Sequence, residues 1–197
     1  FDLDLVSEVM TYNASQGKSA YAAIINRLDR PVSGLVLIAK NKSAAAKYST
    51  LMQKEGGFNK QYEALICGKP SEPKGTFVDY LKKDGRTNTS AIVPADAAAN
   101  DKEAKLSKLE YEVISYDEVK DITHVRIHLI TGRHHQIRVQ FASRRNPLFG
   151  DYKYATADCG MDNAVKAVAL KRNQIALCAV SLTVDNKTYS VAPEFLL

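Results

Sequence analysis

A five-residue apolar run directly after a tight turn constrains the fold of this chain most. The run, Leu35–Ala39, follows the turn sequence Pro31–Gly34. An uninterrupted apolar run of this length, bounded by turn residues, predicts a strand that is buried on both faces. Such a strand holds the residues just before the turn against a core, where functional side chains are often placed.

An acidic residue, Asp29, stands before this turn between Arg27 and Arg30. A nearby opposite charge favours the charged form of a carboxyl group. We therefore expect the two flanking arginines to keep Asp29 ionised at the mouth of a rigid element. The alternative is a structural Asp that caps the turn and pairs with a neighbouring Arg, and the local spacing alone favours that alternative.

Composition restricts the class of protein. The chain has 197 residues, of which 45% are hydrophobic and 25% charged, as in an ordinary globular protein. Its net charge of +5 permits an anionic partner without requiring one. No apolar run has the length of a bilayer span, and the N-terminus lacks the basic start of a signal peptide. Cys67, Cys159 and Cys178 show no CxxC spacing, which predicts reduced thiols in a cytoplasmic protein.

Four segments, in this order, resemble motifs of the RluA-type pseudouridine synthases. They are RLDRPVSG at 27–34, KQYEALICG at 60–68, TGRHHQIR at 131–138 and PLFGDYKY at 147–154. One of these motifs alone is a weak signal, whereas the ordered set is specific. The resemblance extends over roughly residues 25 to 195.

The pattern of elements predicts an α+β fold around a mostly antiparallel sheet. Strands are expected at Lys60–Cys67, Leu106–Tyr116, Ile122–Ile130, Ile175–Leu182 and Tyr189–Pro193, and helices within residues 3–10, 43–55 and 134–143. Residues 11–19 are expected to form a loop, and residues 82–105 a flexible surface excursion. The resemblance implies a pseudouridine synthase catalytic domain, with a bent sheet, flanking helices and a central cleft.

We expect residues 1–197 to form a single catalytic domain. The N-terminal stretch departs from the family, because it contains neither the usual strand that ends in an Asn-Lys-Pro segment nor a small RNA-binding domain.

The resemblance implies an isomerisation that needs no cofactor and no metal. The bond from uracil N1 to ribose C1′ is cut, the base turns, and it is rejoined through C5. The residues agree with this requirement. His124 and His128 lie four apart in an expected strand, so about 13 Å separates them, too far for one metal ion.

By resemblance, Asp29 is the catalytic carboxylate, acting either as nucleophile on C1′ or as base at the ribose 2′ position. Arg138 is implied as its ion-pair partner. Tyr62 is implied to stack on the target base, with its hydroxyl helping to remove the C5 proton. The structural alternatives are an ion pair without catalytic function and a tyrosine packed in the core.

The implied partner is RNA, either ribosomal or transfer RNA, and the chain is expected to be a monomer with no membrane association. Arg27 is implied to fill the gap that an extruded uridine leaves. Asn26 and Cys178 stand where the family often has histidine. The residues expected to contact RNA are Arg27, Arg30, Lys60, Arg133 and Gln136, with Arg144 and Arg145 as further exposed charges.

Two other readings of the sequence remain open. The first is a relative of the family that binds RNA without catalysis or serves as an RNA chaperone. The second, ranked last, is a glycosidase with paired carboxylates. Asp151 is the only motif-borne candidate for the second carboxylate of such an enzyme.

Overall fold

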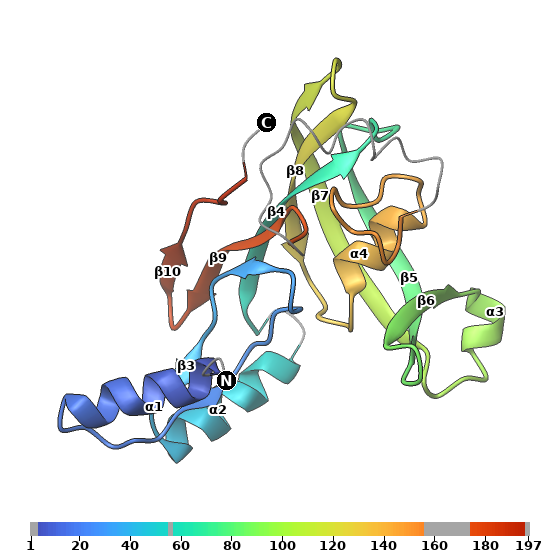
Figure 1. Cartoon of the computed structure of the whole chain (residues 1–197). Coiled ribbons are helices and arrows are strands. Elements are labelled where there is room, and N and C mark those ends of the chain that lie inside the picture. The colour runs from blue at the N-terminus through green and yellow to red at the C-terminus, as the bar shows by residue number, and fades with distance from the viewer. Residues whose placement is uncertain (1–3, 55–56, 156–173, 196–197) are drawn as a thin grey trace.

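A long antiparallel sheet dominates the computed structural model, which describes residues 4–54, 57–155 and 174–195. The eight-stranded sheet has the order β10-β9-β4-β8-β7-β5-β6, and β2 pairs in parallel with β9 (Figure 1). The strands are β2 Ser33–Gly34, β4 Asn59–Cys67, β5 Lys74–Asp84, β6 Thr89–Val93, β7 Lys105–Asp117, β8 Ile122–Leu129, β9 Leu177–Val184 and β10 Lys187–Ser190. The predicted α+β class and antiparallel sheet are confirmed.

Four helices accompany the sheet within the described residues: α1 Leu5–Ser15, α2 Lys42–Gln53, α3 Ala95–Ala98 and α4 Gln136–Ala142. Asn41 caps α2, because its side chain accepts a hydrogen bond from the Ala44 amide. The prediction of a loop at residues 11–19 was wrong for residues 11–15, because α1, which is capped by Asp4, continues to Ser15. No helix in the described ranges is long and apolar enough to cross a membrane.

The two faces of the sheet carry different cores. Tyr62, Ala64 and Ile66 of β4 share one apolar cluster with Ile137 and Phe141 of α4. Leu65 and Cys67 of β4 face the opposite side, where they share a second cluster with Phe149 and Phe195. Side chains alternate between the faces of a strand, so this period places Tyr62 on the same face as α4.

The strand expected over Leu35–Ala39 was wrong. Only Ile38–Ala39 forms a short strand, β3, which pairs with β1 (Ala23–Ile24) apart from the main sheet. Leu35 and Leu37 are half-buried and pack against α2 and Phe58. The run is apolar because it covers one side of a helix, which a run of five residues cannot reveal by periodicity.

The excursion expected at residues 82–105 was also wrong. β5 and β6 form an antiparallel hairpin from Tyr80↔Val93 to Asp84↔Thr89, and α3 follows. The hairpin lies at the edge of the sheet (Figure 1), so only one row of its side chains, including Phe77 and Leu81, is buried. Its polar composition reflects an exposed edge.

Candidate active site

Hydrogen bonds hold the loop that carries Asp29 at both of its ends. The Asn26 side chain donates to the Leu35 carbonyl at 3.1 Å and accepts from the Leu37 amide at 2.6 Å. Farther along, β2 bonds to β9, and a Cβ on Gly34 would lie 2.4 Å from the Ala179 nitrogen. Gly34 has φ +120°, so both its conformation and this close approach require glycine. Asp29 is therefore presented by an immobilised loop.

The Asp29 carboxylate meets the guanidinium of Arg138. Its Oδ2 lies 3.1 Å from Arg138 Nη1, and 27% of its side chain is exposed. Within the described ranges, neither Arg27 nor Arg30 forms an ion pair with it, and both are exposed. The expectation that the flanking arginines hold the charge of Asp29 was wrong, whereas the Arg138 partner expected from the resemblance does contact it.

Arg138 is itself held by a second carboxylate. Its Nε and Nη2 donate to the two oxygens of Asp151 at 2.7 and 2.8 Å, and the Asp151 side chain is 1% exposed. Burial alone would lower the pKa of Arg138, but the carboxylates of Asp151 and Asp29 outweigh it, and the net shift is upward. Arg138 is buried, because paired carboxylates compensate its charge.

Two histidines stand beside Asp29, and sequence reasoning gave neither of them a role. His135 Nε2 lies 3.7 Å from Asp29 Oδ2, and its Nδ1 lies 2.6 Å from the Tyr154 hydroxyl. The His134 ring stacks on His135 with 3.7 Å between centroids. Burial lowers the pKa of His135 to about 4, so its imidazole is neutral at pH 7. The only sequence signal was the position of both histidines and Tyr154 within family motifs.

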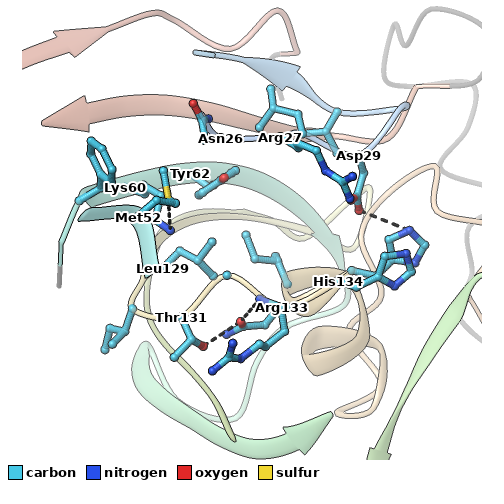
Figure 2. Close-up of a pocket in the computed structure, with 18 of the residues that line it drawn as sticks. Asn26, Arg27, Asp29, Met52, Lys60, Tyr62, Leu129, Thr131, Arg133 and His134 are labelled. Atoms are coloured by element: carbon cyan, nitrogen blue, oxygen red, sulfur yellow. Dashed lines mark hydrogen bonds and ion pairs between the residues drawn. The ribbon is translucent and has the colours of Figure 1, made fainter. Parts of the chain in front are cut away.

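Tyr62 lies in the wall of the cleft, opposite the loop of Asp29 (Figure 2). It is 8% exposed and belongs to the main core cluster. Burial and the negative charge of Asp29 raise the pKa of Tyr62 to about 12. Its hydroxyl therefore remains protonated at neutral pH.

The cleft in front of these residues has a volume of about 800 Å³. Among the described residues that line it, Asp29 is the only carboxylate. The lining cations are Arg27, Lys54, Lys60, Arg133 and Arg138. Such a predominantly positive, concave surface attracts anions.

Four of the residues expected to contact RNA line this cleft: Arg27, Lys60, Arg133 and Gln136. Arg27 and Arg133 are exposed, and Arg133 Nε donates to the Leu106 carbonyl, which fixes its stem. The Lys60 amine contacts the Met52 sulfur at 3.9 Å, and burial lowers the pKa of Lys60 (Figure 2). Arg30 is outside the lining, and Lys54, which sequence reasoning missed, belongs to it.

Gln136 has a different position from the one expected of an RNA contact. Its amide oxygen accepts from the Thr131 hydroxyl and the Arg133 backbone, and its amide nitrogen donates to Lys108 and Gln140. The side chain is buried, so it holds the 131–135 loop in shape. Arg144 was expected to be an exposed charge, but it pairs with Asp79 at 3.0 Å.

Metal-ligating geometry is not found in the described part of the chain, which contains no group of three or more His, Cys, Asp or Glu that could hold an ion. His124 and His128 contact Glu63 and Glu110, respectively, on the outward face of the sheet. Cys67 and Cys178 are buried, and Cys159 lies outside the described residues.

Similar proteins place this geometry in context. The model of the family described as RNA pseudouridylate synthase matches residues 3–143. Ribosomal large subunit pseudouridine synthase C of Rickettsia bellii is 32% identical over 149 residues, which are 76% of this chain and 46% of the relative. Ribosomal large subunit pseudouridine synthase D of Vibrio vulnificus is 30% identical over 177 residues, 88% of this chain and 51% of the relative. The chain thus spans about half the length of these relatives.

Two solved structures share the fold. Human RNA pseudouridylate synthase domain containing 1 aligns with a TM-score of 0.69 and 23% identity over 88% of this chain and 69% of the human chain. Human RNA pseudouridylate synthase domain containing 4 aligns with a TM-score of 0.72 and 17% identity, over 94% of this chain and 76% of the human chain. With the family match extending over most of the chain, this protein belongs to the RNA pseudouridylate synthase family.

Proposed function

We propose that this chain isomerises a uridine in RNA to pseudouridine, with Asp29 as the catalytic carboxylate. The observation that carries the proposal is the Asp29–Arg138 ion pair, which stands at 3.1 Å in a cleft lined by cations. The reaction needs a carboxylate close to ribose C1′ in a site that attracts the phosphate backbone of RNA. The first substrate to test is large-subunit ribosomal RNA, because the relatives from Rickettsia bellii and Vibrio vulnificus carry that substrate in their names.

The chemistry conserves atoms. The N1–C1′ bond breaks, the base rotates, and a C5–C1′ bond forms while the C5 proton leaves and N1 gains one. Asp29 enters either by attacking C1′ or by removing the proton at the ribose 2′ position. Arg138 stabilises the carboxylate in the orientation from which it reacts.

Tyr62 is proposed to stack on the flipped base as a phenol. Since its pKa is raised to about 12, the ionised form is scarce at neutral pH. The hydroxyl thus contributes a hydrogen bond, or accepts the C5 proton only as its own proton departs. Arg27, exposed at the mouth of the cleft, is proposed to occupy the space that the extruded uridine leaves.

The proposal is tested with Asp29→Asn and a large-subunit RNA transcript that carries tritium at C5 of uridine. Wild type should release tritium to solvent, and Asp29→Asn should release none above background. RNA affinity should stay within a few-fold, because phosphate contacts supply most of it. Asp96→Asn, on exposed α3, is the matched control and should behave as wild type.

Two results would contradict the assignment. An active Asp29→Asn enzyme would remove Asp29 from the chemistry. A wild-type chain that binds RNA but releases no tritium from ribosomal or transfer RNA would instead favour the non-catalytic RNA-binding alternative.

A further inference from the structure

A chain of polar contacts runs from the edge hairpin to the carboxylate of Asp29. The Ser90 amide of β6 donates to the Tyr154 hydroxyl at 2.8 Å. That hydroxyl lies 2.6 Å from His135 Nδ1, and His135 Nε2 lies 3.7 Å from Asp29 Oδ2. Ser90 and Tyr154 are therefore linked to one oxygen of the proposed catalytic group through His135.

The direction of each hydrogen bond follows from the donors available. A backbone N–H can only donate, so the Tyr154 oxygen accepts from Ser90. Its own proton is then available to an acceptor, and among the described residues His135 Nδ1 lies within hydrogen-bond distance. With the hydroxyl as donor, Nδ1 is unprotonated, and a neutral His135 carries its proton on Nε2, the atom that faces Asp29.

Burial keeps both rings neutral at pH 7, because it lowers the pKa of His135 to about 4 and raises the pKa of Tyr154. The charged groups that face His135 oppose one another. Asp29 raises its pKa, whereas Arg138, His134 and Lys153 lower it. Tyr154 also holds its ring 5.2 Å from the Arg138 guanidinium carbon, so the same residue contacts both partners of Asp29.

The two oxygens of Asp29 are consequently unequal. Oδ2 faces Arg138 Nη1 and His135 Nε2, whereas Oδ1 forms no hydrogen bond with any of the described residues. The 3.7 Å separation is longer than a hydrogen bond, and such contacts commonly tighten when substrate binds.

We propose that His135 and Tyr154 are positioning residues for Asp29. Tyr154 fixes His135 as the Nε2–H tautomer, His135 holds Oδ2, and Oδ1 is the oxygen presented to the ribose. The statement about Oδ1 rests on the proposed function, whereas the statement about the tautomer does not.

The tautomer is measured by ¹⁵N NMR on the labelled chain at pH 7, with the His135 resonances assigned by their loss in His135→Asn. Wild type should show a protonated Nε2 and an unprotonated Nδ1. Tyr154→Phe keeps the ring against Arg138 but removes the hydroxyl, so His135 should exchange between both tautomers. Tyr152→Phe, at an exposed tyrosine of the same turn, should leave the spectrum unchanged.

The positioning role is measured by single-turnover kinetics. Tyr154→Phe should slow isomerisation by about 10- to 100-fold, the size of effect expected from a small misplacement of a reacting group. Its RNA affinity should stay within about two-fold of wild type, and Tyr152→Phe should turn over at the wild-type rate.

Each result has a definite meaning. A wild-type His135 that is charged or protonated on Nδ1 at pH 7 overturns the inference, as does a Tyr154→Phe enzyme with the wild-type rate. If wild type isomerises no uridine, the proposed function fails and the statement about Oδ1 fails with it. The NMR spectrum then still decides whether Tyr154 sets the tautomer.

Discussion

Two regions of the molecule bring an aspartate to the same arginine, and they do so differently. The loop before β2 offers Asp29, which makes one contact to Arg138 and leaves 27% of its side chain exposed. The turn after Gly150 offers Asp151, which takes two donors of Arg138 and is 1% exposed. Asp29 lines the cleft, and its Oδ1 forms no hydrogen bond with the described residues. Both oxygens of Asp151 accept hydrogen bonds from Arg138, and Asp151 lies outside the lining.

This difference separates the proposed catalytic carboxylate, Asp29, from the carboxylate that supports Arg138. A buried, bidentate carboxylate compensates the charge of Arg138 and fixes its plane. The exposed carboxylate then meets a guanidinium that is already in place. The same contrast removes the basis for the glycosidase alternative, because Asp151 is committed to Arg138 and does not line the cleft.

The largest effect is expected from Arg138→Ala, which strands both carboxylates at once. Removing one side of a buried ion pair typically destabilises a protein by about 3–5 kcal/mol. Urea unfolding should show a loss of this size, together with loss of isomerisation. A decrease below about 1 kcal/mol would mean that neither contact is buried as described.

The next effect compares the two carboxylates directly. Asp151→Asn should lower the free energy of unfolding by about 2–4 kcal/mol, because it breaks the buried pair, and Asp29→Asn by less than about 1 kcal/mol. Double-mutant cycles with Arg138→Ala should give the larger coupling energy for Asp151. Equal couplings would erase the distinction between support and reacting group.

The smallest effect concerns pH and belongs to the Asp29 side alone. The pKa of His135 is about 4 in the folded chain, against its ordinary value of 6.5. Between pH 6.5 and about 4, His135 therefore binds a proton in the unfolded chain but not in the folded chain. The stability that neutral His135 contributes is complete above pH 6.5 and is lost as pH falls toward 4. Between pH 7 and 5 this loss amounts to about 1–2 kcal/mol.

His135→Asn should remove that part of the pH dependence and can keep the backbone, since Asn tolerates the φ of 54° found there. The measurement is the free energy of unfolding of both proteins at pH 7 and 5. Parallel losses of stability in both would show that His135 takes up its proton equally well in the folded state.

Much of this site could be predicted from the sequence because the relevant residues lie in short ordered motifs. The strands at Lys60–Cys67 and Ile122–Ile130 were expected, and the motif set brought Asp29 and Arg138 together from 109 positions apart. The environment of Asp29 could not be predicted. Local charge pointed to Arg27 and Arg30, whereas the contacts come from α4 and its N-terminal boundary, which only the folded chain brings near.

Buried polar residues were the other gap. The sequence predicted the helix within 134–143 but not that its polar side chains are buried. Residues Gln136–Phe141 are all buried, including Arg138 and two glutamines, and periodicity assigns polar residues to the solvent face. Likewise the polar β5–β6 edge resembles a loop in composition. β5 is defined by its pairing with β7, and β6 by its pairing with β5, rather than by their own side chains.

Strand β9 has a consequence for how this site tolerates change. One edge of β9 holds Ser33 opposite Cys178, and its other edge holds Tyr62 opposite Ala179, next to a bulge in the pairing. The loop of Asp29 and the strand of Tyr62 thus pair with adjacent residues of β9, Cys178 and Ala179. A one-residue insertion or deletion within 177–180 would shift both strand pairings together. One in the β9–β10 turn at Asp185–Asn186 would shift neither pairing. The spacing between Asp29 and Tyr62 is therefore set by the strand register of β9, and changes of length in the β9–β10 turn leave it unaltered.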